Sequence, residues 1–479
     1  MNSLSKKSLL LNTSWLSIGI GLGQGINFFS IVIAARYIGP DQYGTYATGL
    51  IVIAFTSILA RFGLMDALVQ REIEPSTTST ALLMSIAFSS VSQICTCLVA
   101  ICFYLSGNIH QASIIVVLGL SAVFLGIQTI PEALYRRRMD FKEISIIRLC
   151  GTIVGSLVLF VGIYVAPSDW ILVAQRVCVE LLVVILLWLR SGICSSLRWD
   201  TERAKDIMLF GRNVGLANFV DVMANQFDQI LVRVIWGEHA LGLYAMARRL
   251  VGNIQQLMFM PFRQVSIAAI ANTKKDVLEV SRVYRRSTRL IMIVAIVVAW
   301  SLFHSGGLII ETLFSQKWLA CVEILKILCW VVIYDAFIIM YPAIVHAYSK
   351  VDWLLYERLS RMIIGVFVLT IFAMLDYGVI GAAYAVIIQS LLSIPLIVFY
   401  LTRLLGKSSY SLCIELLVLS LLSMVCYFSI RSIDFTRFLG GEVEHIVAQN
   451  ILFSSIFCAM GIVFIRANGL DSARELDHR

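Results

Sequence analysis

Charged residues are scarce in this sequence, and polar stretches long enough to form a soluble domain are absent. Only 14% of the 479 residues are Asp, Glu, Lys or Arg, whereas soluble proteins carry about a quarter. Hydrophobic residues make up 59% of the chain, and its mean hydropathy is +0.86. These values exclude a soluble protein and predict an all-α protein that crosses a membrane many times.

Motifs for catalysis and metal binding are also missing. The chain has no Gly-x4-Gly-Lys-Ser/Thr loop, so we expect no nucleotide hydrolysis, and it has no His-Glu-x-x-His sequence. Its eleven cysteines show neither the spacing of a zinc site nor a disulfide framework. We therefore predict a protein that is not an enzyme and holds no metal or cofactor.

Fourteen apolar runs are long enough to span a hydrocarbon core of about 30 Å as helices. Lys and Arg concentrate in every second connection between the runs, whereas the connections near Asn108, Pro167, His239 and Gly378 have none. This asymmetry predicts that both termini are cytoplasmic, and it explains the net charge of +8 without nucleic-acid binding. The runs lie near residues 12–35, 43–69, 80–105, 112–135, 143–166, 169–190, 207–236, 240–263, 289–314, 320–348, 353–375, 378–404, 411–430 and 446–465.

A short motif occurs twice in the chain. The pattern Gly-x4-Gly-x-Tyr-Ala begins at Gly39 and again at Gly237, an offset of 198 residues. In both copies an apolar run with one arginine, Arg36 or Arg233, leads into the turn, and a second apolar run leaves it. Each copy is thus expected to be a helical hairpin that closes at a membrane surface, and the repeat indicates a duplicated domain.

The duplication predicts four segments of the chain. Residues 1–190 form an N-terminal six-helix lobe, 191–206 a polar cytoplasmic linker, and 207–405 a second six-helix lobe. Residues 406–479 form two accessory transmembrane helices and a cytoplasmic tail. Because a six-helix unit returns to the side where it began, the lobes share one orientation, as the repeats of many transporters do.

Five arginines inside apolar runs are candidates for an anion site. Arg61, Arg248 and Arg249 lie about 12–14 Å from the nearest helix end, and Arg148 and Arg361 lie closer to the cytoplasmic end, where they can snorkel. The planar fork of arginine matches phosphate oxygens bidentately.

Because adjacent helical positions diverge by about 100°, only one of Arg248 and Arg249 is expected to point between the lobes. The alternative role for such arginines is a fixed ion pair, for example between Arg61 and Asp66.

One acidic residue is also expected deep in the membrane. Asp228 lies about 13 Å below the turn at Gly237. A carboxylate at this depth is costly to insert and marks a functional site by default. We predict that Asp228 couples transport to a proton or cation, and the alternative is a static hydrogen bond or ion pair to a neighbouring helix.

The stretch 273–289 has a different pattern. Val277, Val280 and Tyr284 follow helical spacing with arginines between them, which predicts an amphipathic helix on the cytoplasmic surface. Its arginines are expected to contact anionic lipid heads. The alternative is a docking surface for a partner.

The order of these features resembles polysaccharide and oligosaccharide-lipid (O-antigen) flippases of the multidrug/oligosaccharidyl-lipid/polysaccharide exporter superfamily. The resemblance covers the whole chain. The pieces that carry it are Ala35-Arg36-Tyr37-Ile38-Gly39, Gly44-x-Tyr46, Phe62-Gly63-Leu64, and Asp228 ahead of Gly237-x4-Gly242-x-Tyr244-x2-Ala247-Arg248.

The resemblance implies two lobes around a central cavity, two extra helices and rocker-type alternating access in the bacterial inner membrane. The implied cargo is an undecaprenyl-pyrophosphate-linked oligosaccharide, carried from the inner to the outer leaflet. The implied partners are this lipid, membrane lipids, a polysaccharide polymerase and chain-length proteins.

Two alternatives remain open at the level of sequence. One is a drug or cation exporter of the same superfamily, and the other is a membrane polysaccharide polymerase or ligase. An enzyme needs an active-site loop on the outer side, and the outer loops here are short. The sign of the buried charge separates a drug or cation exporter from an oligosaccharide-lipid flippase, because buried arginines favour an anionic cargo.

Overall fold

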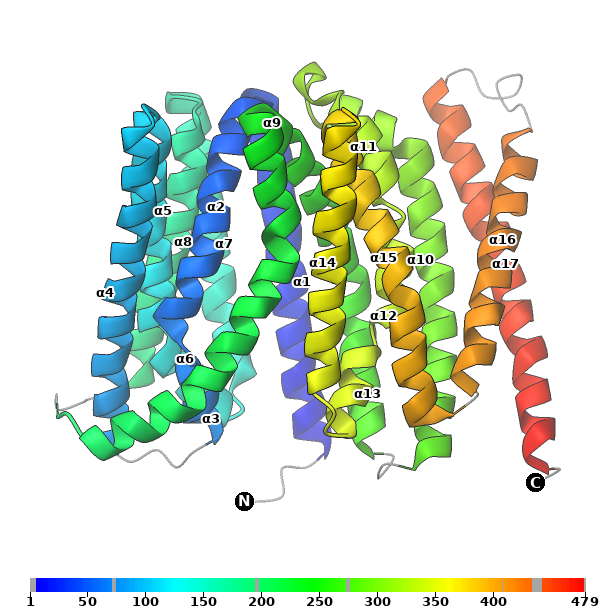
Figure 1. The fold of residues 1–479 in the computed structure, drawn as a ribbon, viewed down its shortest axis with the longest axis horizontal. Coiled ribbons are helices and arrows are strands. Elements are labelled where there is room, and N and C mark those ends of the chain that lie inside the picture. The colour runs from blue at the N-terminus through cyan, green and yellow to red at the C-terminus, as the bar shows by residue number, and fades with distance from the viewer. Residues whose placement is uncertain are drawn as a thin grey trace. The chain divides into compact units, whose positions relative to one another are not determined.

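A computed structural model describes residues 6–70, 75–193, 198–272, 276–406, 408–432 and 442–477 (Figure 1). Within these ranges the chain is helical and has no β-strand, which confirms the predicted all-α class. The elements are α1 (Lys6–Tyr37), α2 (Pro40–Arg61), α3 (Leu64–Gln70), α4 (Pro75–Leu105), α5 (Ile109–Ile127), α6 (Thr129–Arg137), α7 (Phe141–Val165), α8 (Asp169–Ser191), α9 (Thr201–Asn272), α10 (Val277–Leu313), η1 (Gln316–Trp318), α11 (Cys321–Leu328), α12 (Val331–Ile338), α13 (Tyr341–Ala347), α14 (Asp352–Met374), α15 (Gly378–Leu405), α16 (Ser408–Arg431) and α17 (Glu442–Asp477).

Twelve helices among the described residues are long and apolar enough to cross a membrane. The two runs predicted at 207–236 and 240–263 fall in the single helix α9, whose backbone leaves helical geometry at Gly237 (φ 83°, ψ −167°). α14 coincides with the run predicted at 353–375 but carries four charged residues, so it is not among the twelve. The count of fourteen spans stays a prediction.

The chain divides into two compact units. Unit 1 comprises Met1–Met246 and Leu313–Lys317, and unit 2 comprises Ala247–Thr312 and Trp318–Arg479. The first part of α9 therefore packs with the N-terminal helices, and the division falls within α9 at Met246. The lobes 1–190 and 207–405, the linker 191–206 and the accessory segment 406–479 describe the sequence repeat, and they stay predictions.

Small and hydroxyl side chains hold the helices of unit 1 together. α5 packs on α2, α4 and α8, and α7 packs on α1 and α8. The Ser92 hydroxyl donates to the carbonyl of Thr56 at 2.7 Å, and the Ser85 hydroxyl donates to the carbonyl of Gly126 at 2.9 Å. Such contacts suit helices in lipid, where close approach and interhelical hydrogen bonds drive association.

The two copies of the repeated motif meet within unit 1. A Cβ atom built on Gly44 would lie 2.0 Å from the carbonyl oxygen of Glu238, and one built on Gly242 would lie 1.9 Å from that of Pro40. The contact is reciprocal, because each glycine faces the backbone four residues before its counterpart. The repeated glycines thus let two helix starts approach backbone to backbone.

In unit 2, an aromatic cluster joins α16 and α17 to α10. Trp300 of α10 stacks on Tyr427 of α16, with ring centroids 3.9 Å apart, and its indole N–H donates to the Ser423 hydroxyl at 3.1 Å. Phe453 of α17 lies against both Trp300 and Tyr427. The helices at the C-terminal end are therefore packed onto α10 as part of unit 2.

The amphipathic stretch predicted at 273–289 is not a separate surface helix in its described part. From Val277 on it is the start of α10, which continues to Leu313. Two of its arginines, Arg285 and Arg289, form ion pairs with Glu415 of α16 at 2.7 and 2.5 Å. These two arginines share one carboxylate on the neighbouring helix, and the expected contact with anionic lipid heads stays a prediction.

Candidate functional site

Arg61 lies at a break between two helices of unit 1. α2 ends at Arg61, and the next residue, Phe62, adopts the left-handed conformation (φ 32°) and donates its N–H to the carbonyl of Ile58. Gly63 also has positive φ (68°), and a Cβ there would lie 2.8 Å from Cα of Gly211. The break therefore depends on a close glycine crossing with α9, and Arg61 terminates a helix where a continuous one was expected.

Near this break, a buried carboxylate forms ion pairs with two arginines. Glu132 of α6 has a side chain with no exposed surface, and its two oxygens bind different partners. Oε1 accepts from Arg136 at 2.8 Å, and Oε2 accepts from Arg148 of α7 at 2.8 Å. Arg148, a predicted anion ligand, is thus held by an ion pair across two helices.

A second carboxylate lies in α8. Glu180 is buried, and it accepts from Arg176, one helical turn earlier, at 3.0 Å. Its other oxygen accepts from the Gln128 side-chain amide at 3.3 Å. Neither carboxylate was singled out from sequence, although both lie inside or beside apolar runs, and that placement is the signal that could have found them.

Arg61 completes this group of charges, which we call the unit 1 cluster: Arg61, Arg136, Arg148, Arg176, Glu132 and Glu180. Arg61 lies within electrostatic range of both carboxylates, Arg148 and Arg176. Its Nε is buried without a hydrogen-bond partner among the described residues. No Arg61–Asp66 ion pair forms in this part of the chain. Four cations against two anions leave the unit 1 cluster with an excess of two positive charges.

Asp228 is also in unit 1, on α9. It is 1% exposed, and the Tyr244 hydroxyl donates to its Oδ2 at 2.5 Å. Both residues belong to α9, on either side of the break at Gly237. This bond is the kind of static hydrogen bond expected as the alternative to coupling, and it satisfies one oxygen of the carboxylate in an apolar setting.

Unit 2 contains its own group of buried charges. The Gln255 side chain donates to Asp335 of α12 at 2.6 Å. On α14, Arg361 lies 3.6 Å from Glu357, with its guanidinium 5.9 Å from the ring centre of Tyr334. Arg248 lies within electrostatic range of Asp335 and Arg361. This group balances two cations with two anions.

The structure therefore brings the predicted site residues together in pairs. Arg61 and Arg148 share the unit 1 cluster, and Arg248 and Arg361 share the charged group of unit 2. Arg249 follows Arg248 on α9 and is likewise half-buried. Chemically, the unit 1 cluster can attract an anion, because its net charge is positive and arginines offer several donors in a plane.

The chain is helical and multi-pass, and it contains buried arginines. It is therefore a membrane protein with a polar interior. A family model described as "Polysaccharide biosynthesis protein" matches residues 33–323, which is more than half of the chain. The chain belongs to this family of polysaccharide biosynthesis proteins.

The sequence of this chain is similar to those of two curated proteins. The teichuronic acid biosynthesis protein TuaB of Bacillus subtilis (strain 168) is 22% identical over 200 residues, which cover 41% of each chain. The succinoglycan biosynthesis transport protein ExoT of Rhizobium meliloti (strain 1021) is 19% identical over 326 residues, 66% of this chain and 64% of that protein. The chain thus spans less than two thirds of the length of these relatives.

A solved structure shares the fold. The lipid II flippase MurJ, in an inward closed conformation, superposes with a TM-score of 0.70 at 13% sequence identity. The match covers 96% of this chain and 99% of MurJ. The chain therefore shares the fold of that structure.

Proposed function

We propose that this protein flips an undecaprenyl-pyrophosphate-linked oligosaccharide from the inner to the outer leaflet by alternating access. The cargo would be a repeat unit of O-antigen, capsule or exopolysaccharide. Membership of a polysaccharide biosynthesis family supports this proposal, as do the transport function in the name of ExoT and the fold shared with a lipid flippase. A polysaccharide polymerase and chain-length proteins would act on the product.

We also propose that the chain resides in the bacterial inner membrane with both termini in the cytoplasm and acts without catalysing a reaction. The Lys and Arg asymmetry supports this orientation. The cargo then meets the protein on its cytoplasmic side, where oligosaccharide-lipid synthesis would supply it.

The observation that carries the proposal is Arg61 in the positively charged unit 1 cluster. A cation exporter needs buried negative charge, whereas this cluster has an excess of two positive charges. Glu132 and Glu180 engage the other three arginines, so Arg61 is the member best suited to a pyrophosphate. Arg148 would contribute from α7, and Arg248, Arg249 and Arg361 would serve a later position of the cargo.

Arg61→Ala tests this role. A charge-assisted hydrogen bond contributes about 1.5–3 kcal/mol, so its loss should reduce export about 10- to 100-fold. Arg61→Lys should restore only part of the activity, because an ammonium lacks the planar fork. The measurement is polysaccharide export in a strain lacking the gene, with the amount of inserted protein determined by immunoblot.

The matched control is Arg190→Ala, which removes an exposed arginine paired with Glu143 in the same unit. Export by this variant should equal wild type. Normal export by the triple alanine variant of Arg61, Arg248 and Arg249 would exclude the arginine site.

Asp228 provides a second test, because we propose that its carboxylate couples transport to a proton or cation. Asp228→Asn should leave insertion intact and abolish export. Tyr244→Phe removes the hydrogen bond but keeps the carboxylate, so export should persist. Equal loss of export in both variants would mean that the bond itself, and not titration or cation binding, is what export requires.

A further inference from the structure

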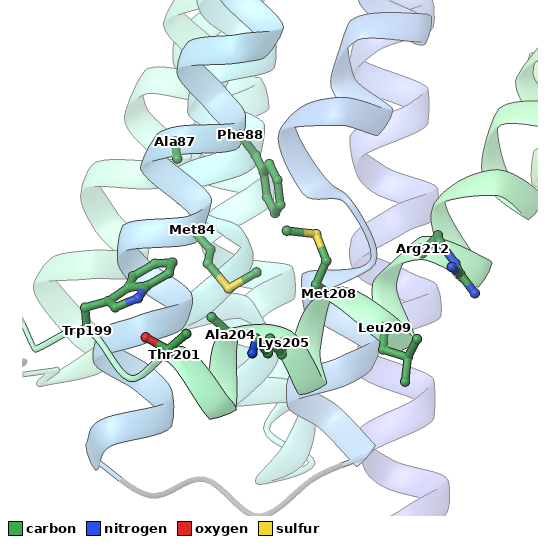
Figure 2. A pocket seen from close by; sticks show the side chains of 10 residues that line it. All are labelled: Met84, Ala87, Phe88, Trp199, Thr201, Ala204, Lys205, Met208, Leu209 and Arg212. Carbon is green, nitrogen blue, oxygen red and sulfur yellow. The ribbon is translucent and has the colours of Figure 1, made fainter.

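An apolar groove of about 580 Å³ lies in unit 1, and no residue of the unit 1 cluster of charges lines it. One wall is α4, and the other is formed by the first turns of α9. Figure 2 shows Met84, Phe88 and Met208 turned toward the space between these helices, with Trp199 and Arg212 at its two ends. Pockets of a few hundred cubic ångströms are large enough for small ligands.

The walls of the groove are fixed to one another. The Asp200 side chain caps the start of α9 by accepting from the backbone N–H of Glu202 at 3.0 Å. The backbone N–H of Asp200 donates to the Thr80 hydroxyl of α4 at 3.1 Å. Further along, Ala204 and Ile207 belong to a core cluster that includes Ala81 and Met84 of α4. The groove is thus built into the packing of unit 1.

The open side of the groove is apolar. Met208 and Leu209 are 44% and 61% exposed, and both line it. A helix that exposes large apolar side chains beside cationic ones is typical of the membrane interface. The thioethers of Met84 and Met208 can adapt to a flexible apolar chain.

Near its start, α9 carries cationic side chains on one stripe and acidic side chains on the neighbouring stripe. Lys205 and Arg212, seven residues apart, lie on one stripe and line the groove, together with Met208. Glu202 and Asp206 lie on the neighbouring stripe and do not line it. The rim therefore presents two cations and no carboxylate, which complements an anionic head group attached to an apolar chain.

We propose that this groove binds an anionic phospholipid, with one acyl chain between α4 and α9 and the phosphate at Lys205 and Arg212. Trp199 would lie at the level of the head groups, where tryptophan is enriched. The bound lipid would hold the first turns of α9 against α4. This site is separate from the proposed cargo site and does not depend on transport.

Photolabelling tests the proposal on the full-length protein. The protein is reconstituted in phosphatidylcholine vesicles that contain either phosphatidylglycerol or phosphatidylcholine with a diazirine in the acyl chain. Wild type should be labelled at α4 and the start of α9 more strongly by the phosphatidylglycerol probe. Each cation near an anionic lipid surface contributes about 1 kcal/mol, so each loss should lower this preference about fivefold.

Three variants make the result specific. The double variant Lys205→Gln, Arg212→Gln should be labelled equally by both probes. The substitution Ala87→Trp should fill the groove and reduce labelling by either probe. Arg198→Gln removes a nearby exposed cation that does not line the groove, and it should behave as wild type. Elution on size exclusion as for wild type establishes that each variant is folded.

Equal labelling of wild type by both probes would overturn the proposal, because the groove would then hold bulk lipid without regard to charge. Stronger labelling by a photoreactive polyprenyl phosphate than by the phosphatidylglycerol probe would also overturn it and would assign the groove to the carried lipid.

Discussion

The reciprocal glycine contact in unit 1 gives a sharp prediction about stability. In Gly44→Ala the new methyl would lie 2.0 Å from a carbonyl oxygen of α9, and in Gly242→Ala it would lie 1.9 Å from a carbonyl oxygen of α2. Both distances are far below a normal contact, and the obstacle in each case is backbone. No side chain can turn away, so the two helix starts must separate.

The cost of such overpacking is typically about 1–3 kcal/mol, and a backbone obstacle places each substitution at the upper end. For a domain of 150–250 residues, about 1 kcal/mol lowers Tm by roughly 2–4 °C. We therefore expect each variant to unfold about 5–10 °C below wild type. A thermal shift of the purified protein in detergent, followed by tryptophan fluorescence, measures the difference.

The double variant distinguishes this contact from two independent sites. One separation of the helices relieves both clashes, so the effects of Gly44→Ala and Gly242→Ala should not add. Gly252→Ala on α9 is the control, because a Cβ there would meet nothing within 4 Å. It should unfold at or slightly above the Tm of wild type. Wild-type Tm in both single variants, or full additivity in the double variant, would refute the reciprocal contact.

Two further predictions concern buried contacts in each unit. Glu132→Gln leaves Arg136 and Arg148 without their shared carboxylate, although both arginine side chains are over 40% exposed and can be solvated in part. Hydrogen bonds to charged groups contribute about 1.5–3 kcal/mol, so the thermal shift should show a loss of stability of about this size in unit 1. Glu143→Gln, at an exposed pair, should change little. Trp300→Ala empties the centre of the aromatic cluster, at a cost of about 3–5 kcal/mol, and should expose α16 and α17 to limited proteolysis. Tyr427→Phe keeps the stacked ring and should resist proteolysis as wild type does.

Much of the fold follows from the composition of the chain and from the length and order of its apolar runs. Long apolar runs with few charges leave helices as the only form in which backbone groups are satisfied in lipid, so the all-α class could be predicted. The turn beginning at Gly39 and the break at Gly237 also followed from the repeated motif. The break after Arg61 was not predicted, because a single glycine in an apolar run does not require one, and the end of α2 depends on how Gly63 meets Gly211.

The candidate site was only partly predictable from sequence. A charged residue in an apolar run is visible in sequence, and this identified Arg61, Arg148, Arg248 and Arg361 as notable. The pairs Arg136–Glu132 and Arg176–Glu180 each lie four residues apart within one helix, a spacing that the sequence shows. The contact of Arg148 with Glu132 was not visible, because it arises only from the packing of α6 and α7. Likewise Arg285 and Arg289 resemble surface cations in the sequence, and only the fold shows that Glu415 of α16 lies beside them.

The two glycine crossings together determine the path of α9 within unit 1. Gly44 and Phe62 are separated by about 27 Å of α2. On α9, their contact Gly211 precedes the break at Gly237 by about 39 Å of helix, and Gly242 follows that break. The helix before the break is thus longer than the distance between the crossings on α2, and Figure 1 shows its first turns running obliquely before the helix turns along α2.

The lipid groove lies on the oblique part of α9, and Asp228 lies between the two crossings. Arg61 directly precedes Phe62, which contacts Gly211. Backbone contacts at glycines thus set where the arginine, the carboxylate and the groove of unit 1 lie, although none of these glycines carries a functional group.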